Sequence, residues 1–360
     1  MAASILKSPA GRLLLKTLGY SPREKLFRLD GDLDKLSRIL LVSSGRLSDL
    51  LFFLPVIEGL RQAAPGVEIE VMTLERWGEF LKREPGVSGL ILYDPQHLKL
   101  RSAAYHHLLK EVKRRSFDAV ILMNDQSDPM RDLVAFASGA PLRIGAHDAE
   151  REAFLNCTVR WGRSGNYRMD LARELSRFLG LHYDPKRWSF TFQPEEIRAA
   201  DQLIHFRKPV KDQILIGVDS ATGLGESRLV ESHLAYIVGH LSGSLRAKVM
   251  LFNLDEAQEG ENTFAARLGS NVLDTPELGL RETLALLSRC DLVVAGNTEL
   301  FHAAVVFGVP VLGLFTDSDK LDWEPRNRES VAVLRGKPGE KISLSELEAS
   351  VKRILHAIPA

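Results

Sequence analysis

The feature that most constrains the fold is an alternation of apolar runs with helix-period segments along most of the 360 residues. Strands of a parallel sheet are buried on both faces and are joined by helices, so they appear as short continuous apolar runs. The alternation therefore predicts a parallel α/β architecture. In the first half we expect strands at 38–44, 67–73, 89–94, 117–125 and 142–147.

The same pattern restarts in the second half of the chain. A stretch with several prolines and aromatic residues, 182–209, has the composition of a linker. Beyond it we expect strands at 213–220, 247–253, 271–275, 291–295, 310–315 and 331–336. Two similar αβ halves predict two Rossmann-like domains facing a cleft, with ligands outside the carboxyl ends of the strands.

Five segments follow from this pattern. They are a basic amphipathic segment (1–35), a first Rossmann-like domain (36–185), a linker (186–212), a second Rossmann-like domain (213–340) and a final helix (341–360).

Composition excludes several classes of protein. The formal net charge is zero, so no overall positive field favours nucleic acid. No apolar run reaches the roughly 18 residues of a membrane span, and the charged N-terminal region does not resemble a signal peptide. Two cysteines far apart suit a reducing compartment. We expect a cytoplasmic protein.

The N-terminal stretch 6–28 places basic residues between leucines. Such a helix can lie on an anionic membrane surface, which would put the protein in peripheral contact with the inner face of the cytoplasmic membrane. The alternative is a helix packed on the first domain with a solvated basic face.

The loop after the first strand carries polar side chains that are candidates for chemistry. Ser44, Arg46 and Ser48 lead to Asp49, where a helix begins. Asp49 is either a helix N-cap or a carboxylate that acts as a general base in the cleft.

A glycine-rich loop follows the first strand of the second half. Ser220 and Thr222 could hold a phosphate together with backbone N–H groups, and Arg228 could add positive charge. The alternative is a plain surface loop.

The stretch 290–315 contains a strand, a polar turn and a helix. Asn297 or Thr298 can cap that helix, whose free N–H groups would attract an anion, and His302 lies about one turn inside it. His302 could meet a diphosphate or a sugar hydroxyl, or it could be a satisfied core histidine. Glu299 favours the second interpretation, because its charge repels a phosphate.

Taken together, these stretches resemble glycosyltransferase family 9, the ADP-heptose:lipopolysaccharide heptosyltransferases. "RLSDLLFFLP" matches the family's first loop, roughly Ser-x-x-Gly-Asp before a helix ending in Leu-Pro, through Asp49 and Leu54-Pro55. "GNTELFHAAVVFGVPVLGLFTDSD" is similar to the family's later motif, and "DWEPRNRESVAVLRG" resembles its Trp-x-Pro segment. The matching positions of the later motif are Thr298, His302, Ala304, Gly308, Pro310 and Phe315.

Several positions depart from the family pattern. Ser48 and Glu299 replace glycines, and Asn297 replaces the motif aspartate. The family's Lys-x-Trp appears as "ESRLVES", so Arg228 is the nearest cation to the missing lysine. A side chain at 299 takes space, and its charge opposes a diphosphate.

The resemblance implies a GT-B fold and an inverting glycosyltransferase without metal or cofactor. A nucleotide sugar, an ADP-sugar by preference, would be bound by Ser220, Thr222, Arg228, Asn297, Thr298 and His302. The acceptor, a lipopolysaccharide-type or other glycan or glycolipid, would lie near Ser44, Arg46 and Ser48, with Asp49 as the base. The departures leave two alternatives open, which are a catalytically degenerate sugar-binding protein and a GT-B enzyme that uses another nucleotide sugar.

Overall fold

The computed structural model describes residues 33–162, 167–183, 190, 192–207, 213–220, 231–254, 271–273, 278–319, 323–325, 329–337 and 342–356. Three parts of the sequence interpretation lie outside the described residues. They are the stretch 255–269, where the pattern predicts a helix, the basic segment up to residue 32, and the candidate ligands Thr222 and Arg228. The chain divides into unit 1, residues 1–163 and 168–188, and unit 2, residues 164–167 and 189–360.

Unit 1 contains a six-stranded parallel sheet of order β3-β2-β1-β4-β5-β6. Its strands are β1 (Arg38–Val42), β2 (Glu68–Leu74), β3 (Gly89–Tyr93), β4 (Ala119–Leu122), β5 (Leu142–Ala146) and β6 (Cys157–Val159). The sequence runs outward from β1 in one direction and from β4 in the other. Their carboxyl ends therefore form the topological switch point, where ligands bind in such sheets.

Helices cover the sheet of unit 1. They are α3 (Leu47–Ala63), α4 (Gly78–Lys82), α5 (Ala103–Arg114), α6 (Pro129–Ala137) and α7 (Met169–Phe178), with short 3-10 turns η1 (Leu33–Lys35), η2 (Glu75–Trp77), η3 (Pro95–His97) and η4 (Ala149–Arg151). Leu40 and Val42 of β1 belong to a buried cluster with residues of α5 and α6. Ile39 and Leu41, also fully buried, point to the opposite face because successive strand side chains alternate.

Unit 2 repeats this topology with the order β12-β11-β10-β7-β8-β9, again parallel. Its strands are β7 (Leu215–Asp219), β8 (Lys248–Phe252), β9 (Val272–Leu273), β10 (Leu292–Ala295), β11 (Val311–Thr316) and β12 (Val331–Gly336). Here the switch point lies between β7 and β10. The predicted pair of Rossmann-like sheets is confirmed.

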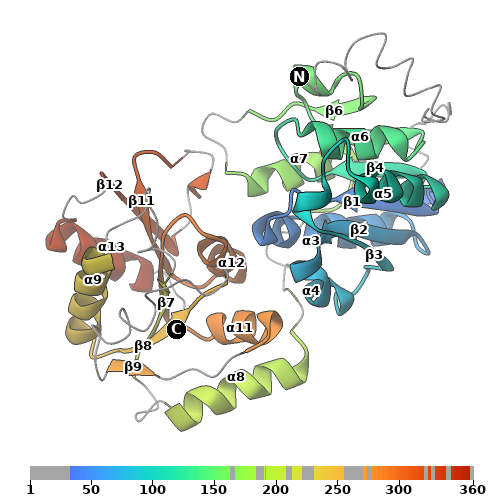
Figure 1. The fold of residues 1–360 in the computed structure, drawn as a ribbon. Coiled ribbons are helices and arrows are strands. Elements are labelled where there is room, and N and C mark those ends of the chain that lie inside the picture. Colours follow the sequence, from blue (N-terminus) through green and yellow to red (C-terminus); the bar gives the residue numbers. More distant parts are fainter. Residues whose placement is uncertain are drawn as a thin grey trace. The chain divides into compact units, whose positions relative to one another are not determined.

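Figure 1 shows the helices of unit 2 on both sides of its sheet. They are α8 (Pro194–Arg207), α9 (Glu231–Ser244), α11 (Leu280–Leu287), α12 (Glu299–Phe307) and α13 (Leu344–His356). Residues of α9 and α13 join β7, β10 and β11 in one buried cluster. Helix α12 packs on β10 and β11, and α11 packs on α8.

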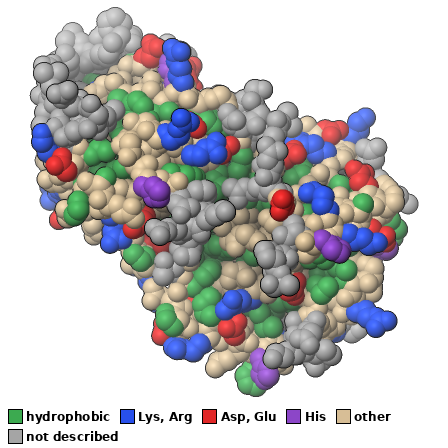
Figure 2. Space-filling view, turned by 180° about the vertical axis from the view of Figure 1, so that it is seen from behind, with side chains coloured by type: hydrophobic (Ala, Val, Ile, Leu, Met, Phe, Trp, Pro, Cys, Tyr) green, Lys and Arg blue, Asp and Glu red, His purple; other side chains and the backbone are tan. Residues whose placement is uncertain are grey.

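The elements that sequence reasoning missed are short or polar. Strand β6 is only three residues long, and α8 lies within the range read as a linker. No helix among the described residues combines the length and hydropathy that crossing a membrane requires. On the face drawn in Figure 2, Lys and Arg side chains of the described part are interspersed with Asp and Glu.

A buried ion pair fixes α8 against α11. Arg281 Nε donates to Glu196 Oε1 at 2.7 Å, and the two side chains are 6% and 4% exposed. Glu196 also accepts a hydrogen bond from the backbone N–H of Gln193 at 2.8 Å, just before the helix begins. The Arg281 guanidinium lies 4.4 Å from the ring of Phe190.

We expect Glu196→Gln to lower the free energy of unfolding of unit 2 by about 3 kcal/mol, because Arg281 then keeps a buried charge without this counterion. Urea titration measures the loss. Glu195→Gln is the matched control, since the Glu195–Arg198 pair is 71% and 66% exposed and such pairs contribute less than about 1 kcal/mol. Equal effects of the two substitutions would contradict the role given to the buried pair.

Candidate functional site

The switch point of unit 1 holds two buried carboxylates around one guanidinium. Arg168, immediately before α7, places Nη2 3.2 Å from Oδ1 and 3.1 Å from Oδ2 of Asp49. Its Nη1 lies 3.1 Å from Oδ1 of Asp125, which follows β4. The three side chains are 10%, 3% and 2% exposed, respectively. These three residues together carry one more negative charge than positive charge.

Asp49 is not the N-cap of α3. That position belongs to Arg46, whose side chain makes no capping hydrogen bond. Asp49 lies in the first turn, where the helix dipole favours a negative charge, and the Ser44 hydroxyl donates to its Oδ2. Within the described residues, Arg168 is the only hydrogen-bond partner of Oδ1. A carboxylate oxygen accepts about two hydrogen bonds, so Oδ1 retains capacity for a proton donor.

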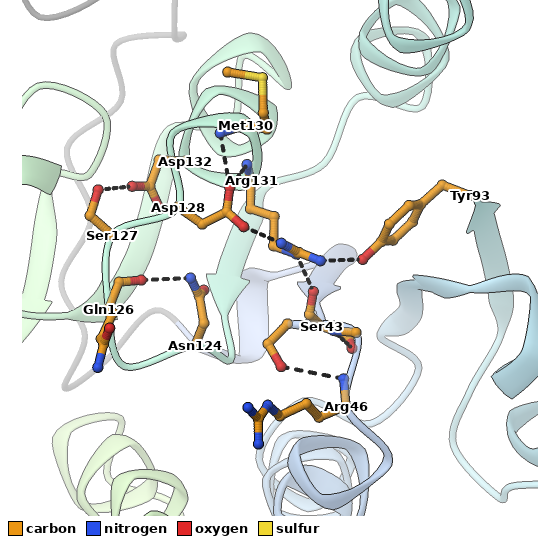
Figure 3. A network of polar contacts seen from close by, with 12 residues as sticks. Ser43, Arg46, Tyr93, Asn124, Gln126, Ser127, Asp128, Met130, Arg131 and Asp132 are labelled. Atoms are coloured by element: carbon orange, nitrogen blue, oxygen red, sulfur yellow. Dashed lines mark hydrogen bonds and ion pairs between the residues drawn. The ribbon is translucent and has the colours of Figure 1, made fainter. Parts of the chain in front are cut away.

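The loop between β1 and α3 is held by side chains from other elements. Arg131 of α6 donates from Nε to the Ser43 carbonyl at 2.9 Å, from Nη2 to the Tyr93 hydroxyl at 2.7 Å, and from Nη1 to Asp128 (Figure 3). Trp77 Nε1 donates to the Gly45 carbonyl at 3.0 Å. Burial raises the pKa of Tyr93 against the opposing charge of Arg131, so the phenol remains protonated at neutral pH.

Gly45 is required at the turn of this loop. Its φ of +94° lies in the left-handed region, and a Cβ there would approach Arg131 Nη2 to 3.2 Å. Ser48 is fully buried within α3, and the Arg46 backbone N–H meets the Ser44 hydroxyl at 3.4 Å. Ser44 therefore contacts the carboxylate directly, Arg46 begins the helix, and Ser48 packs inside it.

A second buried pair fixes the loop that follows β4. Arg151 of η4 and Asp132 of α6 are fully buried, with Nε and Oδ1 3.2 Å apart. Arg151 Nη1 also donates to the Asn124 carbonyl at 2.8 Å, and its Nη2 donates to the Gln126 carbonyl. These carbonyls flank Asp125, so the pair holds the backbone that presents this carboxylate to Arg168.

The corresponding corner of unit 2 joins β10 to α12. Thr298 is the N-cap and accepts a hydrogen bond from the Phe301 N–H at 3.4 Å, while Gly308 ends the helix with a φ of +72°. The cap at Thr298 confirms one of the two positions that the sequence offered. Glu299 is partly exposed at the first helical position. The remaining N–H groups of this first turn form an electropositive end that suits an anion.

His302 is buried in α12, and both ring nitrogens meet side chains. Nε2 lies 3.1 Å from Asn297 Oδ1, and Nδ1 lies 2.8 Å from the Tyr167 hydroxyl. Asn297 Nδ2 donates to Asp319 Oδ1 at 3.0 Å. The Trp323 ring flanks the imidazole, with the two centroids 4.9 Å apart. The candidate histidine therefore belongs to a connected hydrogen-bond network.

Ser220, at the end of β7, donates its hydroxyl to the Phe252 carbonyl at 3.2 Å and is buried. Sequence reasoning thus named Ser44 and Asp49 in unit 1 and Ser220, Asn297, Thr298 and His302 in unit 2. It missed Arg131, Asp125 and Arg168 in unit 1, and Tyr167 and Asp319 in unit 2. Asp125 carried one usable signal, because it ends the apolar run 117–125 that predicted a buried strand.

Comparisons with known proteins agree with this architecture. A family model described as "Glycosyltransferase family 9 (heptosyltransferase)" matches residues 105–350, more than half of the chain. The lipopolysaccharide core heptosyltransferase OpsX of Haemophilus influenzae is 23% identical over 290 residues, which is 78% of this chain and 79% of that protein.

Solved structures share the fold. A glycosyl transferase family 9 protein of Veillonella parvula superposes with a TM-score of 0.73 at 18% identity, covering 93% of this chain and all of that chain. The E. coli heptosyltransferase WaaC with ADP gives 0.65 at 18% identity, covering 89% and 99%. The predicted GT-B fold class, with its two Rossmann-like domains, is confirmed.

The Asp132–Arg151 pair generates a pH prediction. Burial raises the pKa of Asp132 to about 6, and the charge of Arg151 offsets this only in part. The folded state therefore holds a proton that the unfolded state releases near pH 4, so stability should fall as pH rises from about 4 to about 6 and then level off. The measurement is the difference in free energy of unfolding between wild type and Asp132→Asn over this range. We expect a fall of about 2 kcal/mol; a flat or rising difference would contradict the raised pKa.

Proposed function

This chain belongs to glycosyltransferase family 9 (heptosyltransferase) and is therefore a glycosyltransferase; we propose that it moves a heptose-like sugar from a nucleotide diphosphate sugar to a lipopolysaccharide-type acceptor, with inversion. The single observation that carries the mechanism is the Asp49 carboxylate, oriented by Arg168 and Ser44 at the switch point of unit 1.

A single displacement needs one base and no enzyme nucleophile. In the proposed reaction, Oδ1 of Asp49 takes the proton from the acceptor hydroxyl. The acceptor oxygen then forms a bond to the anomeric carbon as the bond to the nucleotide diphosphate breaks, which inverts the configuration. A positioned base of this kind typically accelerates a reaction by about 10²–10⁴-fold.

The leaving diphosphate needs stabilisation on the donor side. We assign this role to the first turn of α12, capped by Thr298, with Asn297, His302 and Ser220 beside it. Thr222 and Arg228 belong to the same proposal as phosphate ligands. Prepositioned N–H groups suit this task because they need not reorganise as charge develops. The E. coli heptosyltransferase WaaC, whose structure holds ADP, supports ADP-sugar as the donor class.

Two measurements test the proposal. Calorimetry with ADP-, GDP- and UDP-sugars should show binding of the ADP-sugar; binding of another nucleotide alone would replace the donor, and binding of none would favour a protein without transfer activity. Asp49→Asn should lower turnover by at least about 10²-fold while leaving donor affinity unchanged. Asp34→Asn, which changes an exposed carboxylate in unit 1, is the control, and unchanged turnover in Asp49→Asn would remove Asp49 from the mechanism.

An acceptor of this class is a glycolipid, so we propose that the protein works in the cytoplasm in peripheral contact with the inner membrane. The basic stretch 6–28 supports this contact through attraction to anionic lipids. The full chain should float with vesicles containing anionic phospholipid, and deletion of residues 1–30 should abolish flotation. Flotation that survives the deletion would remove this segment from the contact.

A further inference from the structure

Four side chains of unit 2 form a continuous hydrogen-bonded relay. It runs from Asp319, just beyond β11, through Asn297 and His302 to Tyr167, with distances of 3.0, 3.1 and 2.8 Å. His302 is 2% exposed and Tyr167 is 4% exposed. The relay passes through the corner between β10 and α12, so it fixes the side chains next to the first turn of α12.

Donors and acceptors can be assigned along the relay. Asp319 accepts on both oxygens, from Asn297 Nδ2 on Oδ1 and from the Thr316 N–H on Oδ2 at 2.7 Å. Its carboxylate therefore requires the amide nitrogen of Asn297, because the amide oxygen would be repelled. Asn297 Oδ1 then faces His302 and accepts from Nε2–H. The remaining nitrogen, Nδ1, accepts from the Tyr167 hydroxyl, which completes the pattern with a neutral imidazole.

We propose that Asp319 and Tyr167 are positioning residues of the donor site, and that they hold Asn297 and His302 in one orientation with His302 as the neutral Nε2–H tautomer. The role as part of a donor site rests on the function proposed above. Asn297 replaces the aspartate of the family motif. In this protein the carboxylate belongs to Asp319, which is the hydrogen-bond partner of Asn297. Asn297 therefore links the carboxylate at 319 to His302 through its amide group.

The carboxylate at 319 has hydrogen-bond donors of its own. At 319 the charge is met by the Thr316 N–H and by the Thr316 hydroxyl, whose Oγ1 lies 3.0 Å from Oδ2. The neutral amide of Asn297 is oriented by this carboxylate and in turn orients the imidazole of His302.

A reciprocal exchange tests this assignment. Asn297→Asp alone places a second carboxylate next to that of Asp319, and the two charges repel each other. Asp319→Asn alone must turn an N–H toward either the Asn297 amide or the Thr316 N–H. In the double variant, residue 319 donates to the carboxylate at 297 and still accepts from Thr316, while the carboxylate accepts from His302 Nε2–H. Every hydrogen bond of the wild type is then restored with the two groups exchanged.

Calorimetry under identical conditions measures the affinity of each variant for ADP. We expect each single variant to bind ADP at least about tenfold more weakly, because half-buried polar groups lose their hydrogen-bond partners. The double variant should return to within about threefold of wild type. Asp317→Asn, an exposed carboxylate on the same connection, should bind like wild type. Single variants that bind normally, or a double variant as weak as either single variant, would overturn the proposal.

A second measurement, made without nucleotide, separates this inference from the proposed function. Nitrogen-15 spectra of histidine-labelled full-length protein report which ring nitrogen of His302 carries the proton. We expect Nε2–H in wild type and in the double variant, and a shifted Nδ1 signal in Tyr167→Phe. An Nδ1–H tautomer in wild type would overturn the relay. If wild type shows Nε2–H but does not bind ADP, the donor assignment fails, and with it the placement of these residues in a donor site.

Discussion

An ionised carboxylate removed from water needs a counterion, and Arg168 supplies one to two carboxylates at once. Asp49 and Asp125 follow different strands and meet only because β1 and β4 are neighbours whose carboxyl ends lie at the same edge. Without the guanidinium, two buried carboxylates at this edge would repel each other. The orientation of Asp49 therefore depends on Arg168, which reaches it from a residue 119 positions away in the sequence.

The same requirement shapes the rest of unit 1. Strand ends expose carbonyls that no neighbouring strand pairs, and arginines from helices meet them. Arg131 binds the Ser43 carbonyl, and Arg151 binds the carbonyls of Asn124 and Gln126. Each arginine also pairs with an aspartate of its own surroundings, Asp128 or Asp132. A planar guanidinium with five donors can serve several acceptors at once, which an ammonium group cannot do with the same geometry. The loops on both sides of the switch point are thus held by charge-assisted hydrogen bonds.

The sequence predicted the layers well because a strand buried on both faces needs a continuous apolar run, as in 38–44 and 291–295. It missed β6, whose three residues are too few to show a period, and α8, whose first residue, Pro194, and charged face resemble a linker. It selected Asp49, Thr298 and His302 because each lies in the loop or the helix that follows a predicted strand and matches a motif of the family. Arg168, Tyr167 and Asp319 carry no such local signal, since each acquires its role only when the chain brings together residues distant in sequence.

Two of these unpredicted residues are consecutive. Tyr167 contacts His302 within unit 2, and Arg168 contacts Asp49 within unit 1, so the peptide bond between them is one of the points where the chain passes from one unit to the other. This short stretch of chain therefore contributes one side chain to each corner. Two consecutive residues thus supply a hydrogen-bond partner of an imidazole and an ion-pair partner of a carboxylate.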